Sequence, residues 1–405
     1  MKRQRGDKPL WGGAEATTVQ FPPAPLCWIE PDDFNPDMKN SLGLILPLLL
    51  FFCLISVCFY LPQFLGGETV KEAYFYQKLD NHAVQCQLCP RFCFIEPGRR
   101  GFCRVRENRD GILYTLVYAK PCAIHIDPIE KKPLFHFLPS SSAFSIATVG
   151  CNLKCVFCQN WHISQASPEE IDYTYLEPEE LIERVLDSGS PTIAYTYTEP
   201  VIFYEYMLDT AKLAQARGIK NVMHSAGHIN EQPLRELCKY LDAANIDLKG
   251  FSQEFYGEMT LGSLDSVLRT LKILKEEGVW VEITNLILPG YNDDDKTIIK
   301  MCLWIKENLG VDVPVHFSRF WPMYKMLSLN PTPTATLEKA KRIAEDCGLK
   351  YVYIGNIPGH SAENTYCPNC KEVVIERTGY TVRGVHLDEL GRCEFCQEEI
   401  PGIWK

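Results

Sequence analysis

The sequence predicts an α/β fold built on a parallel sheet, with a small cysteine-rich module on either side of it and an apolar segment ahead of them. Three observations lead to this prediction. Strand-like and helical patterns alternate between about residues 172 and 356, eleven of the 18 cysteines form three tight clusters, and residues 40–67 contain no charged side chain. A chain of 405 residues has room for one barrel-sized domain and smaller appendages.

The composition narrows the class of protein. Hydrophobic residues make up 46% of the chain and charged residues 23%, which is ordinary for a folded protein and excludes wholesale disorder. The net charge of -10 argues against a nucleic-acid binder, because phosphate recognition needs a clustered cationic surface. We therefore expect no DNA or RNA partner.

The composition of the first 65 residues indicates a flexible tail followed by a membrane anchor. Residues 1–40 mix prolines, glycines and both charge signs without apolar periodicity, which is typical of a flexible tail. Residues 41–65 form an apolar run, and about 20 apolar residues suffice for a transmembrane helix. A cleaved signal peptide and a buried core helix are the alternatives. Lys39 before the run and Lys71 and Lys78 after it favour a single-pass protein whose domain C-terminal to the run faces the cytoplasm.

The segment 70–135 contains the first cysteine cluster and a lead-in strand at 112–118. The cluster consists of Cys86, Cys89, Cys93 and Cys103. Four thiolates can close a tetrahedral site, and closed four-cysteine sites are usually structural zinc sites. Zinc is therefore favoured, and an iron-sulfur cluster is chemically possible as well.

The second cluster has a spacing that suits an iron-sulfur cluster with one open iron. Cys151, Cys155 and Cys158 form a Cys-x3-Cys-x2-Cys triplet within residues 147–161. Such clusters ordinarily take four protein thiolates, so three ligands leave one iron free for a substrate or cofactor. An open iron indicates chemistry rather than electron storage alone. A zinc knuckle or chance clustering is the alternative for this stretch by itself.

Around and after the triplet, alternating patterns predict a parallel sheet covered by helices. The predicted strands are 144–149, 192–197, 221–225, 243–248, 280–287, 313–317 and 351–354. The predicted helices between them are 178–187, 201–217, 231–241, 264–277, 294–308 and 335–347. Barrel enzymes place their chemistry at the carboxyl ends of such strands, and the triplet follows one of those ends.

The third cluster, in residues 361–405, predicts a small zinc ribbon. Cys367 and Cys370 form one Cys-x2-Cys pair, and Cys393 and Cys396 form another. Two such pairs about 20 residues apart are a strong signal for a structural zinc site. A module of this size has little core of its own, so closing the site would supply folding energy.

From about Val70 to the C-terminus, the sequence resembles the radical S-adenosylmethionine (SAM) enzyme of the AmmeMemoRadiSam system, which is grouped with pyruvate formate-lyase activating-enzyme-like proteins. The resemblance rests on the triplet with Phe157 before its last cysteine and on the strings Gln-Cys-Gln-Leu-Cys-Pro, Tyr-Thr-Glu-Pro, Asp-Leu-Lys-Gly, Leu-Pro-Gly-Tyr-Asn-Asp and His-Phe-Ser-Arg-Phe. It implies a partial (β/α)6 TIM-like barrel over residues 136–360, a [4Fe-4S] cluster, and SAM cleavage to a 5'-deoxyadenosyl radical.

The resemblance also implies partners and site residues. A flavodoxin or ferredoxin would donate one electron, and Memo-like and AMMECR-like proteins are candidate partners. Glu199 resembles the carboxylate that receives the ammonium of SAM, and Asp247, Lys249 and His316 resemble SAM-binding residues of glycyl-radical activases. Asn285 is a candidate ribose or adenine contact.

Two other functions stay open at this point. An activase that installs a glycyl radical on a partner enzyme is the first alternative. Many activases carry Asp-Gly-Pro-Gly upstream of the triplet, whereas residues 140–144 here contain no such turn. A membrane-tethered metal-binding scaffold without catalysis is the second alternative. The substrate itself is not indicated by the sequence.

Overall fold

A computed structural model describes residues 70–405. The predicted tail at 1–40 and the predicted transmembrane helix at 41–65 lie outside the described residues. Within residues 70–405, no helix has the length and apolar character that a membrane crossing requires.

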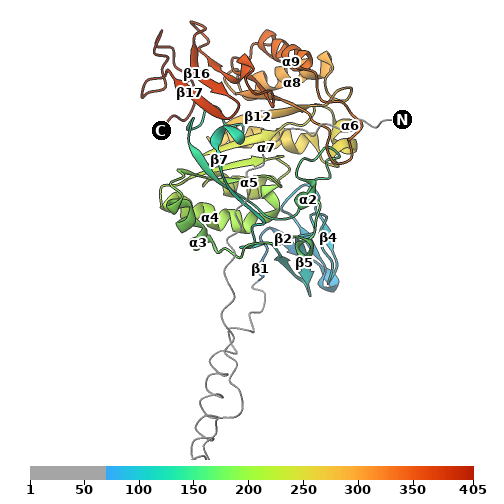
Figure 1. Cartoon of the computed structure of the whole chain (residues 1–405). Coiled ribbons are helices and arrows are strands. Elements are labelled where there is room, and N and C mark those ends of the chain that lie inside the picture. The colour runs from blue at the N-terminus through green and yellow to red at the C-terminus, as the bar shows by residue number, and fades with distance from the viewer. Residues whose placement is uncertain (1–69) are drawn as a thin grey trace, which may run out of the picture. The chain divides into compact units, whose positions relative to one another are not determined.

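An eight-stranded sheet forms the centre of the described unit (Figure 1). Its strands are β7 (Ala123–Pro128), β8 (Ser142–Ala147), β9 (Thr192–Tyr195), β10 (Lys220–Ser225), β11 (Ala243–Asp247), β12 (Trp280–Ile287), β13 (Val315–Arg319) and β14 (Val352–Gly355). Strands β8 to β14 lie side by side in chain order and pair in parallel, whereas β7 pairs antiparallel with β8. The two edge strands, β7 and β14, are not neighbours in this sheet, so it forms an incomplete barrel.

One helix crosses over between each pair of consecutive parallel strands. These helices are α3 (Pro178–Asp187), α4 (Tyr204–Ala216), α5 (Glu231–Cys238), α7 (Leu264–Glu276), α8 (Asp295–Asn308) and α9 (Thr334–Asp346). Local sequence explains where they begin, because Ser263 and Asp294 cap α7 and α8 with their side chains and Pro178 is the first residue of α3. The α/β class and the six crossovers therefore agree with the prediction.

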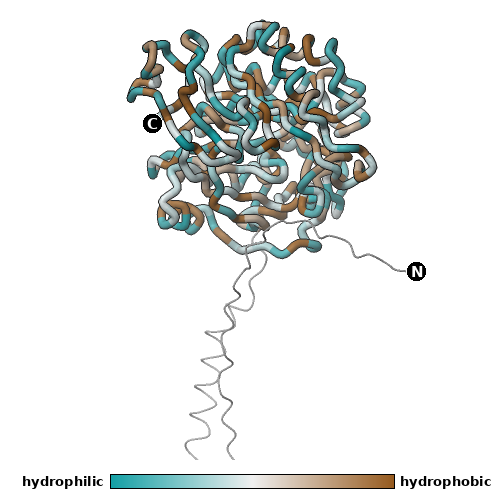
Figure 2. Tube along the Cα trace, turned by 45° about the horizontal axis from the view of Figure 1, so that its top comes forward, coloured by the Kyte–Doolittle hydropathy of each residue, from teal (hydrophilic) through white to brown (hydrophobic). Residues whose placement is uncertain are grey.

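The sheet is buried on both faces, as parallel sheets usually are. Every residue of β9 is buried, and so are the last five residues of β8. Figure 2 shows hydrophobic stretches running through the interior of the molecule. The predicted strand at 313–317 begins two residues later, at Val315, because Pro314 has no N–H to donate to a ladder.

Shorter elements complete the fold. The short helices that matter for the sites below are α2 (Trp161–Ser164), η5 (Pro200–Phe203), α6 (Gln253–Phe255) and the π-helical turn η6 (Tyr256–Thr260). Further single turns are η2 (Asp80–His82), η3 (Ile129–Lys131), η4 (Pro168–Glu170) and η7 (Ser361–Glu363).

The N-terminal module consists of two small antiparallel sheets. One contains β1 (Lys71–Glu72), β6 (Ile112–Thr115) and β5 (Arg106–Arg109), and the other contains β2 (Tyr76–Lys78), β3 (Val84–Cys86) and β4 (Phe94–Ile95). The predicted strand at 112–118 is thus shorter than expected, and it pairs within this module rather than with the barrel.

The C-terminal module is a three-stranded sheet of β15 (Thr365–Tyr366), β16 (Val373–Thr378) and β17 (Thr381–Val385). In Figure 1, β16 and β17 lie at the opposite end of the molecule from β2, β4 and β5. The module packs on the barrel through Phe135, Tyr353 and Val374. The buried Arg377 fixes it in place by donating hydrogen bonds to the Phe135 carbonyl (2.7 Å) and the Thr365 hydroxyl (2.8 Å).

Candidate active site

A cavity of about 420 Å³ opens at the carboxyl ends of the parallel strands. All three cysteines of the triplet line it, and so do Phe157, Glu199, Asp247 and Lys249. The remaining lining side chains include His224, Ser225, Thr284, Leu286 and Ser318 from the ends of β10, β12 and β13. The fold therefore gathers, in one place, residues as far apart in the sequence as Cys151 and Ser318.

The triplet lies on a loop that follows β8, and backbone hydrogen bonds hold this loop against η6. The amides of Lys154 and Val156 donate to the carbonyls of Thr260 (2.8 Å) and Met259 (3.0 Å). On its other side, the Lys325 amide donates to the Val156 carbonyl (3.0 Å). A π-helical turn is rare and is frequently found at functional sites. The loop is thus fixed before any cofactor binds.

The three thiols suit a metal cluster better than they suit free thiolates. Burial raises the pKa of Cys155 to about 12 and raises the pKa of Cys151 well above its usual value. A thiolate at these positions therefore needs a cationic partner, which a metal supplies when it displaces the proton. The Leu153 amide donates to the Cys151 sulfur (3.3 Å), and such hydrogen bonds are common at cluster sulfurs. The donor set and its setting fit a [4Fe-4S] cluster with one open iron.

Glu199 lies at the end of β9 and caps η5. Its carboxylate accepts hydrogen bonds from the Ser225 hydroxyl (2.5 Å) and from the amides of Ala226 (2.8 Å) and Val201 (3.3 Å). Burial nevertheless raises the pKa of Glu199, because only part of the desolvation is offset by these hydrogen bonds. An approaching ammonium group would stabilise the ionised form, which suits the predicted role.

Asp247 and Lys249 form an ion pair at the end of β11. The Lys249 Nζ lies 2.7 Å from Asp247 Oδ2, and His224 Nε2 lies 3.1 Å from Asp247 Oδ1. Burial alone would raise the pKa of Asp247, but the charge of Lys249 and the contact with His224 outweigh it and hold that pKa well below its usual value. Both members of this ion pair also line the cavity.

His316 and Asn285 lie outside the cavity lining, in contrast to the expectation. His316 Nε2 contacts Glu282 Oε2 at 2.7 Å, and its ring stacks on Tyr353 at 4.9 Å. On β13 it is Ser318, two residues further along, that reaches the cavity. On β12 the cavity is lined by Thr284 and Leu286, so Asn285 points to the other face and donates to the Leu248 carbonyl (2.6 Å).

The structure adds cavity residues that the sequence did not indicate. Lys131, Lys132, Tyr197 and Tyr380 line a second polar region of the cavity. The Asp127 carboxylate links the first three of these residues, since it accepts hydrogen bonds from Lys131 (2.8 Å), Lys132 (2.5 Å) and the Tyr197 hydroxyl. Burial lowers the pKa of Lys132 to about 8. Tyr380 lies in the β16–β17 turn, so the C-terminal module helps to line the cavity.

The C-terminal cysteines converge on one point. The metal-binding atoms of Cys367, Cys370, Cys393 and Cys396 all lie within 4.8 Å of one another, and two of the sulfur pairs are 3.5 Å and 3.7 Å apart. Four sulfurs at about 2.3 Å from a tetrahedral ion lie about 3.8 Å from each other. The donor set therefore fits one zinc ion.

Comparisons with known proteins agree with this site. The Radical SAM superfamily profile matches residues 145–302. An uncharacterized protein of Methanocaldococcus jannaschii, MJ0808, is 49% identical over 332 residues, which cover 82% of this chain and 99% of that protein. The pyruvate formate-lyase 1-activating enzyme of Escherichia coli is 22% identical over 220 residues, which cover 50% of this chain and 89% of the enzyme.

A solved structure of Streptococcus suis SuiB bound to S-adenosylmethionine aligns with a TM-score of 0.44 and 14% identity, over 59% of this chain and 56% of SuiB. The sequence matches identify the chain as a radical SAM enzyme with the α/β fold of that superfamily. Within the superfamily, it belongs to the same family as MJ0808.

Proposed function

We propose that this radical SAM enzyme forms a 5'-deoxyadenosyl radical that removes a hydrogen atom from a protein, peptide or small-molecule substrate. One observation carries the proposal: the three triplet cysteines share a cavity with Glu199, Asp247 and Lys249 at the ends of parallel strands. A [4Fe-4S] cluster on these cysteines, with SAM at its open iron, would supply the one-electron cleavage of the sulfonium bond.

The protein residues would bind and orient SAM. Glu199 is already held by three hydrogen bonds, so it can accept an ammonium without moving. Lys249 is a fixed cation close enough to Cys155 to affect the pKa of that thiol, so it would stabilise negative charge beside the cluster. Leu153, Phe157 and Leu286 give the cavity an apolar wall that excludes water from a reactive radical.

The Lys132–Asp127–Tyr197 group and Tyr380 would position the substrate. Lys132, Tyr197 and Tyr380 line the cavity, and Asp127 pairs with the first two. These residues come from β7, the residue after η3, the segment after β9 and the β16–β17 turn rather than from the triplet loop. Because their charges are already paired, they offer a preorganised set of hydrogen-bond donors instead of a free charge. This favours a substrate that presents polar acceptor groups to the mouth of the barrel.

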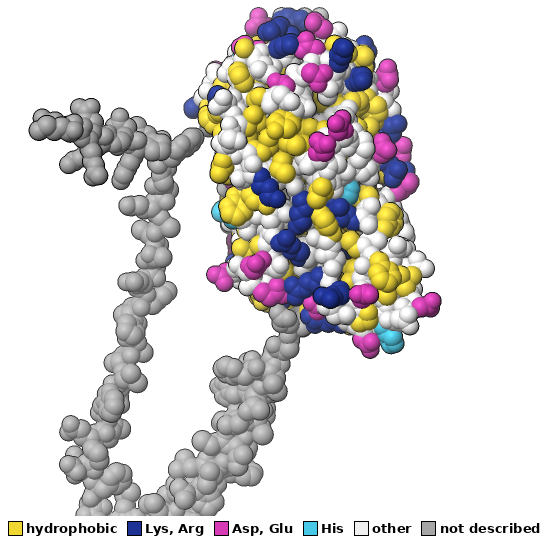
Figure 3. Space-filling model, turned by 90° about the vertical axis from the view of Figure 1, so that its right-hand side faces the viewer, with side chains coloured by type: hydrophobic (Ala, Val, Ile, Leu, Met, Phe, Trp, Pro, Cys, Tyr) yellow, Lys and Arg dark blue, Asp and Glu magenta, His cyan; other side chains and the backbone are white. Residues whose placement is uncertain are grey.

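Electrons would come from a flavodoxin or ferredoxin, the usual donors of radical SAM enzymes. Figure 3 shows one face of the molecule, on which Lys and Arg side chains gather at mid-height.

We further propose a structural zinc ion in the C-terminal module, a membrane tether at 41–65 and the Memo-like and AMMECR-like proteins as partners. Fractionation of the full chain tests the tether, since recovery in the soluble fraction without detergent would contradict it.

Measurement of 5'-deoxyadenosine tests the central proposal. The full chain, reconstituted anaerobically with iron and sulfide and reduced with dithionite, should convert SAM to 5'-deoxyadenosine and methionine. Cys155→Ala should lose this activity, whereas the control Cys122→Ala should retain it because Cys122 lies in none of the three clusters. Equal, background-level product from the wild type and Cys155→Ala would refute the proposal.

An activase remains the second candidate, because the Escherichia coli pyruvate formate-lyase 1-activating enzyme matches over 89% of its own length. Incubation with pyruvate formate-lyase, SAM and dithionite separates the two functions. A glycyl-radical signal in electron paramagnetic resonance (EPR) spectra would favour the activase. Production of 5'-deoxyadenosine without that signal is the result expected for the leading proposal.

A further inference from the structure

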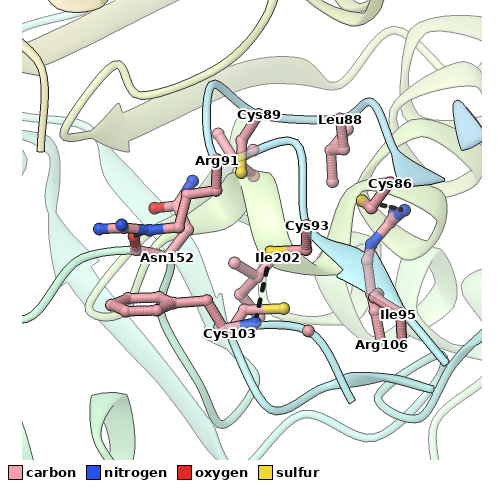
Figure 4. A pocket seen from close by; sticks show the side chains of 13 residues that line it. Cys86, Leu88, Cys89, Arg91, Cys93, Ile95, Cys103, Arg106, Asn152 and Ile202 are labelled. Atoms are coloured by element: carbon pink, nitrogen blue, oxygen red, sulfur yellow. Dashed lines mark hydrogen bonds between the residues drawn. The ribbon is translucent and has the colours of Figure 1, made fainter. Parts of the chain in front are cut away.

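The four cysteines of the N-terminal module line a cavity of their own, separate from the active site. Figure 4 shows Cys89, Cys93 and Cys103 around one space, with Cys86 beside the guanidinium of Arg106. Cys86 ends β3, Cys89 and Cys93 lie in the loop before β4, and Cys103 returns after a turn at Gly101. All four are free thiols, so disulfide formation does not account for their convergence.

The spread of the four sulfurs differs from what a single ion requires. Within residues 70–405, the C-terminal cysteines are the group of metal-ligand type whose binding atoms lie within 4.8 Å of one another, and the N-terminal cysteines do not meet that limit. A tetrahedral zinc ion would bring its four sulfurs to about 3.8 Å from each other. In an iron-sulfur cluster each thiolate binds a different iron, so its ligands stand further apart around a central space.

We propose that this cavity binds a second [4Fe-4S] cluster, held by Cys86, Cys89, Cys93 and Cys103. The proposal goes beyond the radical function and does not depend on it. It also replaces the zinc ion that the spacing alone favours at these residues. With four protein thiolates, every iron has a protein ligand, so this cluster differs from the active-site cluster in having no position for SAM.

The cavity wall suits a buried cluster. Apolar side chains of Leu88, Ile95 and Ile202 line it and restrict access of water. Two donors face the sulfurs, since the Phe102 amide lies 3.5 Å from the Cys93 sulfur and Arg106 Nη1 lies 3.8 Å from the Cys86 sulfur. Burial and hydrogen bonds to sulfur are the means by which proteins set the properties of such clusters.

Two buried polar atoms of the lining have no partner in the protein. Arg106 is 1% exposed, and its Nε makes no hydrogen bond. Asn152 is also 1% exposed, and its Oδ1 makes none. Buried polar atoms are normally satisfied, so unpaired atoms in the lining of one cavity indicate an occupant that carries polar or charged atoms.

The cavity shares its walls with the active site. Val201 and Ile202 of η5 line it, while Glu199, which caps the same turn, lines the SAM cavity. Asn152 lies between Cys151 and Leu153 of the triplet loop, and its carbonyl accepts a hydrogen bond from Arg91 Nε (2.6 Å). Only one turn of chain and one loop therefore separate the two cysteine sites.

Metal analysis of a triplet variant tests the proposal. In the full chain, Cys151→Ala/Cys155→Ala/Cys158→Ala removes the ligands of the active-site cluster. After anaerobic purification and reconstitution with iron and sulfide, it should still contain about four iron and four sulfide per chain, against about eight of each in the wild type. Dithionite should produce an EPR signal that SAM does not change.

A second variant identifies the ligands. Adding Cys89→Ser and Cys93→Ser to the triplet variant should reduce the iron content from about four per chain to near zero while the zinc content is unchanged. The retained zinc and an unchanged circular dichroism spectrum show that the variant is folded. If it does not fold, the EPR signal and sulfide content of the triplet variant decide the matter by themselves.

The opposite result is equally definite. A triplet variant with no iron and two zinc ions per chain would overturn the proposal in favour of a structural zinc site. Failure here is also distinguishable from failure of the radical function. A wild type that makes no 5'-deoxyadenosine, together with a triplet variant that keeps four iron, would refute the function alone.

Discussion

The N-terminal and C-terminal modules each contain four cysteines, yet the fold arranges their thiols differently. In the C-terminal module, each Cys-x2-Cys pair lies in a tight turn, in which the amides of Lys371 and Gln397 donate to the carbonyls of Cys367 (3.1 Å) and Cys393 (2.8 Å). Two such turns face each other and bring four sulfurs together. In the N-terminal module, the ligands come from a strand end, a loop and a distant turn, so they surround a space.

The modules also attach to the barrel in different ways. The C-terminal module is held by a buried aromatic group that includes His136, whose Nδ1 donates to the Pro401 carbonyl (2.7 Å) and whose Nε2 accepts from the Tyr353 hydroxyl (2.6 Å). The N-terminal module is held by the fully buried ion pair Arg106–Glu205. Cysteine spacing therefore indicates a metal site, whereas the backbone between the cysteines decides how far apart the sulfurs lie and so which metal group fits them.

The largest expected effect is the loss of the C-terminal site. Cys367→Ser should abolish zinc binding and release β15 to β17, because structural zinc contributes on the order of 10 kcal/mol to small modules that fold around it. Zinc analysis and hydrogen exchange of β16 measure the two effects. Cys347→Ser is the control, since Cys347 lies outside the clusters. Retention of one zinc per chain by Cys367→Ser would contradict the assignment.

The second prediction concerns the ion pair under the N-terminal module. Arg106→Met should lower the free energy of unfolding by about 3–5 kcal/mol, because it leaves the buried Glu205 carboxylate without its guanidinium partner. Urea denaturation measures this loss. The double variant Arg106→Met/Glu205→Gln should recover part of it, and Arg184→Met, at an exposed ion pair, should have little effect. A loss below about 1 kcal/mol for Arg106→Met would show that the pair is unimportant.

The third prediction is a pH dependence of the C-terminal attachment. Burial lowers the pKa of His136 from 6.5 to about 4, although Glu282 partly opposes this shift. The unfolded chain then binds the proton more readily, so this contribution to stability is complete above about pH 6.5 and decreases as the pH falls toward 4, by about 3 kcal/mol. His136→Gln should remove this dependence. Denaturation at several pH values between 7 and 4 measures the free energy of unfolding of both proteins. If this free energy falls equally with pH in the wild type and in His136→Gln, the prediction is contradicted.

The smallest expected effect concerns the contact between the N-terminal module and the triplet loop. Gly150 has φ +102°, and a Cβ there would lie 2.6 Å from Val105 Cγ1 and 2.9 Å from the Cys103 carbonyl oxygen. Gly150→Ala should therefore destabilise the protein by about 1–3 kcal/mol and disturb both cysteine sites. Thermal unfolding and iron content measure this. Gly189→Ala, where φ is +69° and no atom lies within 4 Å, should affect stability but leave the iron content unchanged.

Local patterns were sufficient for much of the barrel. The predicted helix at 178–187 has the observed bounds, because Pro178 starts it and its buried residues recur at helical spacing. The triplet, Glu199, Asp247 and Lys249 lie at or after strand ends, and the structure brings them into one cavity because the ends of parallel strands meet in space. Period-2 alternation, however, separates the two faces of a strand without showing which face meets the cavity or how far along the strand the cavity extends. It could not show that His316 lies too deep to reach the cavity or that Asn285 points away from it.

The α/β alternation, the three cysteine clusters and the likeness to radical SAM enzymes could all be inferred before the fold was known, since they depend on short spacings along the chain. The three-dimensional fold was needed to show that Lys132 and Tyr380 enter the active-site cavity, because the end of η3 and the C-terminal turn meet there from distant positions in the chain. It also decided how far apart the thiols of each module lie. Sulfur separations depend on how strands, loops and turns pack, and residue spacing does not specify that packing.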